Sequence, residues 1–379
     1  MENDLLELLE ALLSIDSVNP DLVPGARGEG EIAGFVAEWL RARGLEVHVE
    51  DTARPGRPNV VAVARGTGGG RSLILNSHMD TVGVAGMQEP FRPVVRDGRL
   101  YGRGAIDTKA ALAAFMAVTA DAARLGLRGD LILTAVVDEE YASAGTEAVV
   151  KKWKADAAIV GEPTGLEIVT AHKGFAWFEI ETRGVAAHGS RPDLGVDAIA
   201  KMGKVLVEIE EAAARLMKSR SHRMLGHASL HASLITGGQE LSSYPALCRL
   251  GIERRTLPGE DFDEIEAELR ALLEKIRRAD PSFSATLRRA FTRDPLEVPW
   301  SEPVVDTLKR AVAAKTGAPA ILSGMGGWMD SALLSAAGIP TVIFGPRGEG
   351  LHAETEWVDL ASAVACREIV LAAVKDFCR

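Results

Sequence analysis

Apolar and polar positions along the first half of the chain alternate with periods that switch between those of helices and strands. An acidic amphipathic helix is predicted over the first 18 residues, and a second helix over about 30–43 ends at Gly44. The apolar runs at 59–64 and 72–78 predict buried strands around a glycine-rich turn. Helix and strand therefore alternate, as in an open α/β sheet.

Acidic residues follow the next apolar runs of the chain. A core helix is predicted over 110–123, and the segments LILTAVVDEE and AAIVGEP each place an apolar strand ahead of one or more glutamates. In open α/β sheets, ligands collect beyond the carboxyl ends of the strands. The pattern therefore places these acidic side chains at the edge of the sheet where a site is expected.

From about Gly174 the pattern becomes strand, helix, strand, strand, helix, strand, which is the ferredoxin-like order. After about Asp294 the earlier α/β pattern resumes with two helices and the apolar strand TVIFG. We therefore expect one discontinuous α/β domain, residues 1–174 and 291–379, that is interrupted by an inserted α+β domain, residues 175–290.

The composition is that of an ordinary globular protein with a large core, since 47% of the 379 residues are hydrophobic and 25% are charged. A formal net charge of -10 without a basic block argues against nucleic acid or an anionic membrane as partner. Three scattered cysteines indicate reduced thiols, and no apolar run approaches the length of a membrane span. A cytoplasmic location is expected.

Histidines and carboxylates recur where the predicted strands end. A single such residue is more often structural, but burying so many carboxylates without cations would be prohibitive. The mixture suits Zn²⁺, Co²⁺ or Mn²⁺, and a pair of ions needs one bridging carboxylate, for which Asp107 is the natural candidate. The residues concerned are His78, Asp80, Asp107, Glu139, Glu140, Glu162 and His352.

Many motifs occur in an order that resembles the M20 metallopeptidase family, in particular its acetylornithine deacetylase and succinyl-diaminopimelate desuccinylase branch. The motifs are SHMDTV, GRGAIDTKA, DEE, GEPT, HKG, AAHGS, RPDLGVDAI, ERRTLPGE, GIPTVIFGP and LHAETEWV. The resemblance spans nearly the whole chain. It implies a zinc-dependent exopeptidase-like α/β catalytic domain with an inserted ferredoxin-like lid, which also serves for dimerisation.

The resemblance also implies the ligands of two divalent metal ions, zinc or alternatively cobalt or manganese. His78 and Glu162 would bind the first ion, Glu140 and His352 the second, and Asp107 would bridge them.

Three further acids near these ligands receive supporting roles. Glu139 is the proposed general base, which takes a proton from water and returns it to the leaving amine. Asp80, two residues after His78, is expected to accept the imidazole N–H and fix its tautomer. We expect Glu356 to do the same for His352.

The inserted domain supplies residues that the resemblance assigns to the substrate. His188 in AAHGS would reach across a homodimer interface to stabilise the oxyanion, and Arg255 in ERRTLPGE would bind a substrate carboxylate. Ser242 stands where relatives carry an asparagine that helps to hold the substrate. Met329 replaces the usual threonine beside Trp328, and if both line the pocket they favour an apolar or aromatic group.

The function expected from these residues is that of a di-zinc amidohydrolase that deacylates N-acyl-L-amino acids, similar to acetylornithine deacetylases and aminoacylases. The alternative is a dipeptidase or a glutamate-type carboxypeptidase with the same metal centre, because these substrates also carry an amide beside a carboxylate. A non-catalytic binding protein that keeps the fold is the rival from another class. That rival should lose the base or a ligand, and all of these positions are intact here.

Overall fold

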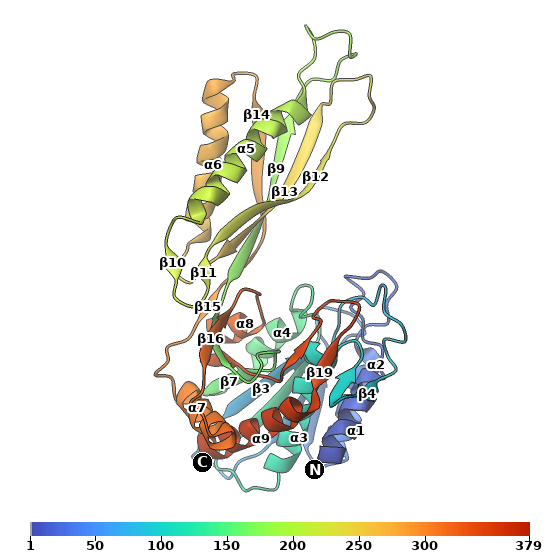
Figure 1. Cartoon of the computed structure of the whole chain (residues 1–379), viewed down its shortest axis with the longest axis vertical. Coiled ribbons are helices and arrows are strands. Elements are labelled where there is room, and N and C mark those ends of the chain that lie inside the picture. The colour runs from blue at the N-terminus through green and yellow to red at the C-terminus, as the bar shows by residue number, and fades with distance from the viewer. Residues whose placement is uncertain (1) are drawn as a thin grey trace. The chain divides into compact units, whose positions relative to one another are not determined.

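The computed structural model describes residues 2–379 and divides the chain into two compact units (Figure 1). Unit 1 comprises the chain up to Thr170 together with Val298–Ser323 and Met329–Arg379, and unit 2 comprises Ala171–Glu297 and Gly324–Trp328. The predicted mixed α/β fold is confirmed. The domain limits predicted at 174/175 and 290/291, and the catalytic and lid roles of the two domains, stay predictions.

The largest sheet of the described residues has nine strands, in the order β1-β2-β6-β3-β7-β17-β8-β15 with β16 beside β8. Strands β2, β3, β6 and β7 are buried at every residue, which explains why their sequences are apolar runs. The strands are β1 (Glu46–Glu50), β2 (Asn59–Ala64), β3 (Leu73–His78), β6 (Leu131–Val136), β7 (Ala157–Val160), β8 (Ile168–His172), β15 (Leu296–Glu297), β16 (Leu322–Met325) and β17 (Thr341–Ile343).

Helices and a smaller sheet complete unit 1. Helix α3 is apolar on every side and almost wholly buried, as a core helix should be. No helix in the described part of the chain is both long and apolar enough to cross a membrane. The helices are α1 (Glu2–Leu13), α2 (Gly30–Arg41), α3 (Ala110–Ala122), α4 (Ala144–Lys152), α7 (Pro303–Thr316), α8 (Ser331–Ala336) and α9 (Leu360–Phe377). The smaller sheet has the order β18 (Gly348–Glu349), β19 (Trp357–Asp359), β5 (Arg99–Tyr101) and β4 (Val94–Arg96).

Unit 2 is a four-stranded antiparallel sheet with two helices on one face (Figure 1). Its strand order is β12-β13-β9-β14, and a short hairpin of β10 (Ser221–His222) and β11 (Gly226–His227) lies between α5 and β12 along the chain. The main elements are β9 (Gly174–Arg183), α5 (Ala198–Leu216), β12 (Ser229–Gly237), β13 (Leu247–Thr256), α6 (Phe262–Ala279) and β14 (Ser284–Arg293). These elements follow the β-α-β-β-α-β order that the sequence predicts.

Side-chain caps set the starts of both helices in unit 2. Helix α5 begins at Ala198, where the Asp197 carboxylate caps it by accepting a hydrogen bond from the N–H of Ala200. Asp261 caps α6 in the same way. The apolar stripes of both helices pack on one face of the sheet around Phe178, Ile180 and Leu250. The opposite face of the sheet carries no helix of this unit.

Candidate metal centre

Three strands of unit 1 end at one edge of the large sheet, and a histidine or acidic residues stand at each end. His78 is the last residue of β3, residues 138–140 follow β6, and Glu162 lies shortly after β7. Because β3 is parallel to both β6 and β7, the carboxyl ends of the three strands are neighbours. The sheet therefore gathers side chains that are far apart in the sequence.

Asp107 reaches the same place from the turn Ala105–Lys109, in which the backbone angles of Asp107 and Thr108 are not helical. The Glu356 carboxylate accepts hydrogen bonds from two backbone N–H groups of this turn, at 2.9 and 3.1 Å, and from Arg103 Nη1 at 2.6 Å. The peptide bond after Asp107 is cis. The described hydrogen bonds of Glu356 thus hold the turn that carries Asp107, whereas the sequence led us to expect that it would orient His352.

The carboxylate of Asp107 lies between two imidazoles. His78 Nε2 is 3.2 Å from Asp107 Oδ1, and His352 Nε2 is 3.3 Å from Asp107 Oδ2. His352 Nε2 also lies 3.2 Å from Glu140 Oε2. Each oxygen of Asp107 therefore faces a different histidine, as expected of a carboxylate shared by two cations.

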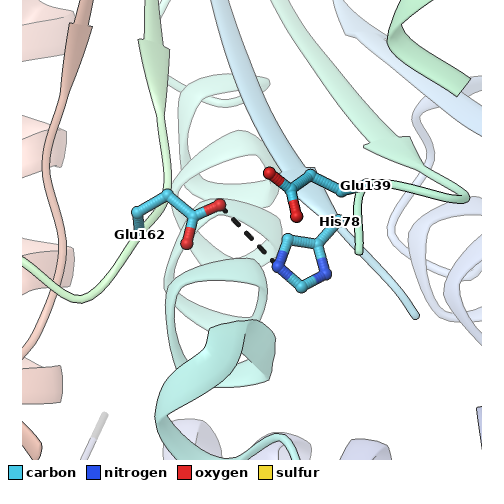
Figure 2. Close-up of side chains that lie close together, drawn as sticks. All are labelled: His78, Glu139 and Glu162. Carbon is cyan, nitrogen blue, oxygen red and sulfur yellow. Dashed lines mark ion pairs between the residues drawn. The ribbon is translucent and has the colours of Figure 1, made fainter. Parts of the chain in front are cut away.

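Glu139 and Glu162 also lie close to His78 (Figure 2). The Oε1 atom of Glu162 is 3.7 Å from His78 Nε2, and Figure 2 shows the carboxylates of both glutamates beside the His78 ring. Ligand atoms of these three residues lie within 4.8 Å of one another. The adjacent residues Glu139 and Glu140 thus face different neighbours, Glu162 for the first and His352 for the second.

Asp80 is buried behind the histidine. His78 Nδ1 lies 2.9 Å from the backbone oxygen of Asp80 and 3.6 Å from its carboxylate, so the nearer acceptor is the main chain. The Asp80 carboxylate accepts the backbone N–H of Glu139 at 3.1 Å and that of Glu140 at 3.2 Å. Asp80 therefore connects the histidine to the turn that carries both glutamates.

The histidines of the cluster hold their protons tightly. Hydrogen bonds to Asp107 and Glu140 raise the pKa of His352 to about 10. Burial by itself lowers the pKa of His78, but the hydrogen bonds with Asp107 and Asp80 and the nearby negative charges raise it well above its usual value. Burial opposes ionisation of Asp107, yet the two imidazoles hold its pKa below the usual range.

The neighbouring glutamates retain protons as well. Burial and adjacent carboxylates raise the pKa of Glu139 and of Glu162 well above the usual range, although the charge of His78 favours ionisation. Burial and the charge of Asp107 raise the pKa of Glu140 to about 7. Several carboxylates therefore compete for too few positive charges in a space that excludes water.

These residues fit divalent metal ions. Glu140 Oε1 is buried without a hydrogen-bond partner among the described residues, so this residue of the cluster has an acceptor with available lone pairs. Ligand atoms of His78, Asp107 and Glu140 lie within 4.8 Å of one another and form a second group beside that of His78, Glu139 and Glu162. Imidazole nitrogen and carboxylate oxygen together are donors that Zn²⁺, Co²⁺ and Mn²⁺ accept. Divalent cations would also balance the excess of buried acid.

The substrate residues expected in unit 2 fall into two places. His188 and Ser242 lie in neighbouring exposed loops, where Gly189 N–H donates to the backbone oxygen of Ser242 at 2.7 Å. His188 Nδ1 is 2.8 Å from Ser190 Oγ. Arg255 lies at the opposite end of the same sheet, because it stands next to the last residue of β13. The structure brings His188 and Ser242 together and leaves Arg255 apart from them within this unit.

Arg255 lies in an aromatic and cationic cluster at its end of the sheet. Phe175 on β9 has Arg255 and Arg293 as cross-strand neighbours on its two sides. The guanidinium carbon of Arg255 is 5.2 Å from the centre of the Phe175 ring, and that of Arg293 is 5.4 Å from the Trp328 ring. Trp328 is only partly buried, whereas Met329 is 5% exposed and packs into unit 1. Of the two residues considered from the sequence, Trp328 is therefore the accessible one.

Sequence reasoning missed several buried polar residues behind the cluster. Asn19 donates to the carboxylates of Asp80 and Asp138, and Arg57 pairs with Glu29 and Asp138. Asp138 is the first acid of the DEE motif, so that motif offered a signal. Asn19, Glu29 and Arg57 fall in polar stretches of the first 60 residues without periodicity, where no pattern distinguished them.

Known proteins resemble this chain in sequence and in fold. The sequence model of peptidase family M20/M25/M40 matches residues 74–376. Acetylornithine deacetylase of Myxococcus xanthus is 31% identical over 381 residues, covering 98% of this chain and 96% of that protein. The crystal structure of aminopeptidase PepT from Bacillus cereus superposes with a TM-score of 0.82 at 22% identity, covering 100% of this chain and 99% of that one. A dinuclear metal-binding peptidase of the M20 family from Bacillus subtilis gives 0.76 at 16% identity, covering 99% and 98%.

Proposed function

The chain belongs to peptidase family M20/M25/M40 and is a metal-dependent hydrolase of amide bonds, and we propose that it deacylates N-acyl-L-amino acids with two zinc ions. The observation that carries the proposal is the position of Asp107, whose two carboxylate oxygens each face a different histidine. His78 and Glu162 would hold one ion, and Glu140 and His352 the other. Bound there, the ions would polarise the amide carbonyl and make a water molecule more acidic.

Glu139 is the proposed general base. Its carboxylate lies among the ligand atoms, while its backbone N–H is fixed by Asp80. Burial and the neighbouring carboxylates raise the pKa of Glu139, which supports the assignment because a carboxylate of raised pKa accepts a proton more readily. A base of this kind takes a proton from the attacking water and gives it to the departing nitrogen, which cannot leave as an anion. Of the two glutamates, Glu140 contacts His352 and is therefore assigned to metal binding.

We propose that Arg255 binds the carboxylate of the substrate. Its Nε donates to Glu253, and none of the described residues accepts a hydrogen bond from its two terminal nitrogens. That edge of a guanidinium matches a carboxylate in a bidentate pair. The Phe175 and Trp328 rings beside the arginines offer apolar surface, which favours an aromatic or apolar side chain over the charged chain of acetylornithine. Ser242 and His188 keep the substrate-holding and oxyanion roles proposed from the resemblance.

We also propose a homodimer in which two copies meet along β12. This strand is at the edge of the unit 2 sheet, and Leu234 and Ile235 on it are 75% and 53% exposed. An exposed apolar edge strand is a template for pairing with another strand, and a second copy of the chain offers the same edge. Replacing both residues by lysine should convert a dimer into a monomer in analytical ultracentrifugation. A wild-type protein that sediments as a monomer would contradict the proposal.

A substrate panel with controlled metal loading tests the proposed activity. The metal-free protein is assayed before and after addition of zinc or cobalt against N-acetylphenylalanine, N-acetylmethionine, acetylornithine, succinyl-diaminopimelate and several dipeptides. We expect metal-restored hydrolysis that is fastest for the acetylated apolar or aromatic amino acids. Preferred cleavage of dipeptides would replace deacylation by a peptidase activity of the same centre. Acetylornithine as the best substrate would contradict the proposed role of Trp328.

A further inference from the structure

The turn that carries Glu139 and Glu140 is held by side chains. Three successive backbone N–H groups donate to carboxylates: that of Asp138 to Glu29 at 3.0 Å, that of Glu139 to Asp80 at 3.1 Å and that of Glu140 to Asp80 at 3.2 Å. Asp138 has a φ of 69°, which a residue with a side chain adopts only at a cost. The direction of both glutamates therefore depends on where the Asp80 carboxylate lies.

Asn19 contacts the two aspartates at this turn. Its Nδ2 lies 2.8 Å from Asp80 Oδ2 and 3.2 Å from Asp138 Oδ1, and the residue has no exposed surface. A carboxamide nitrogen carries two hydrogens, so one is available for each carboxylate. The Asn19 amide is itself fixed, because its Oδ1 accepts the Asp21 N–H at 2.9 Å and its backbone N–H donates to Thr81 at 2.9 Å.

The two aspartates differ in their other partners. Asp138 receives Arg57 Nη2 at 3.0 Å on one oxygen and Arg54 Nε at 3.0 Å on the other, so arginines balance its charge. Apart from His78, the described side chains supply Asp80 with one hydrogen-bond donor, which is Asn19. Without that donor, Asp80 would keep its two backbone N–H donors but lose its link to Asp138, a second buried carboxylate, which repels it. The hydrogen bonds of Asn19 thus link the Asp80 carboxylate to Asp138, whose charge the two arginines balance.

We propose that Asn19 is a positioning residue of this hydrolase. Its carboxamide cross-links Asp80 to Asp138 and so fixes the peptide from which Glu139 and Glu140 project toward the metal centre. A neutral amide suits this task because it satisfies two carboxylates without adding a cation that would compete with metal ions for them. The inference rests on the proposed metal centre, and Asn19 itself contacts none of the predicted ligands among the described residues.

Replacing Asn19 by leucine tests the proposal most cleanly. Leucine has the same branched shape and no charge, but it donates no hydrogen bond. Alanine at the same position leaves room for water, which can donate to both carboxylates. We expect Asn19→Leu to weaken zinc binding by about 10–100-fold, as the loss of supporting hydrogen bonds at metal sites commonly does. Asn19→Ala should be milder. kcat should fall with zinc affinity, while KM stays near the wild-type value because the substrate carboxylate is bound elsewhere.

Asn76→Leu is the matched control. Asn76 is also a buried asparagine near the site, two residues before His78, but its amide donates to the hydroxyls of Thr134 and Thr146 and to no carboxylate. Zinc affinity is measured by competition with a chromophoric chelator, and the thermal unfolding of each metal-free variant gives its stability. We expect Asn76→Leu to lower the unfolding temperature and to leave zinc affinity close to that of the wild type.

The possible results distinguish a failure of the proposed role of Asn19 from a failure of the proposed metal centre. A wild-type protein that binds no zinc would remove the metal centre itself. If the wild type binds zinc and Asn19→Leu binds it equally well, or loses only stability as Asn76→Leu does, Asn19 is merely structural. Greater damage from alanine than from leucine would indicate a packing role and would also overturn the proposal. If the leucine variant does not fold, the alanine variant decides. Unchanged zinc affinity in Asn19→Ala overturns the proposal, and a several-fold loss of zinc affinity supports it.

Discussion

Acidic side chains lie in very different surroundings in the two units. In unit 1, Asp80, Asp107 and Glu162 are 0%, 8% and 6% exposed and face other charged groups. In unit 2, Glu211 on α5 is 53% exposed and lies 3.8 Å from Lys275 on α6, in contact with solvent. Surface pairs of this kind contribute little to stability, whereas buried charges must be compensated one by one. Burial, more than the number of charges, therefore marks the functional region.

The largest expected effect is loss of turnover when the buried base is removed. Glu139→Gln should lower kcat by roughly 10²–10⁴-fold, the usual contribution of a general base, with zinc content nearly unchanged. Glu211→Gln in unit 2 makes the same chemical change at the surface and should leave kcat as it is. Steady-state kinetics with parallel metal analysis measures both. If zinc and activity were lost together in Glu139→Gln, Glu139 would be a ligand and the assignment as base would be wrong.

The next effect concerns stability. Arg57→Ala in unit 1 leaves the buried carboxylate of Glu29 without its guanidinium and Asp138 with that of Arg54 alone, and we expect a loss of about 3–5 kcal/mol in the free energy of unfolding. Lys275→Ala in unit 2 removes a surface pair and should cost less than about 1 kcal/mol. Denaturant unfolding of the two variants measures the difference. Equal losses of unfolding free energy in the two variants would show that the buried ion pairs of unit 1 contribute no more to stability than the surface pairs of unit 2.

Arg255 differs from Glu211 and Lys275, the surface pair of unit 2, since we propose a function for it. Arg255→Lys keeps the charge but loses the paired terminal nitrogens, so KM should rise by about tenfold with a smaller change in kcat. An exposed arginine of the same sheet, Arg249, provides the control. An unchanged KM for Arg255→Lys in substrate titrations would place the substrate carboxylate elsewhere.

The smallest effect is a dependence of stability on pH in the metal-free protein. His352, with a folded pKa of about 10 against about 6.5 when unfolded, adds stability that is complete below pH 6.5 and is lost as pH rises through 10. Glu140, with a folded pKa of about 7, disfavours the folded state increasingly as pH rises from about 4.3 to 7. Both pKa values are higher in the folded protein than in the unfolded chain, so both groups make the folded state less stable as pH rises.

Chelator-treated protein should therefore unfold at a lower temperature at pH 9 than at pH 5. Because metal ligands must be deprotonated, the rise in unfolding temperature on adding zinc should grow over the same range. Differential scanning calorimetry from pH 5 to 9 follows both quantities. A metal-free protein that became steadily more stable toward pH 9 would mean that the cluster does not hold its protons as described.

The apolar pattern predicted the parts of the fold that are fully buried. Strands β3, β6 and β7 are apolar runs with acidic or histidine residues at or just after their carboxyl ends, so the sequence indicated both the strands and the edge that carries the candidate site. The elements of unit 2 were predicted because α5 and α6 alternate apolar and polar residues with helical period. The assignment of roles to Glu139 and Glu140 came from family resemblance, since adjacent residues differ in no periodic property.

The elements that were not predicted lack such a pattern. Helix α4 has a weakly amphipathic sequence, and β4 and β5 are three-residue strands in a polar stretch. The link through Asn19 could not be predicted because it joins residues 61 and 119 positions apart through one side-chain amide. Likewise, Glu356 is four residues from His352 in sequence, yet its described hydrogen bonds go to Arg103 and the Asp107 turn. Contacts of this kind depend on tertiary structure alone.

The proposed centre of two metal ions is tested by zinc binding to the metal-free wild-type protein. The protein is titrated with zinc, bound metal is counted per chain, and hydrolysis of N-acetylphenylalanine is followed in the same samples. The arrangement of both histidines around Asp107 predicts two zinc ions per chain and activity that depends on them. Hydrolysis at an undiminished rate without metal, or a folded chain that binds no zinc, would contradict the account.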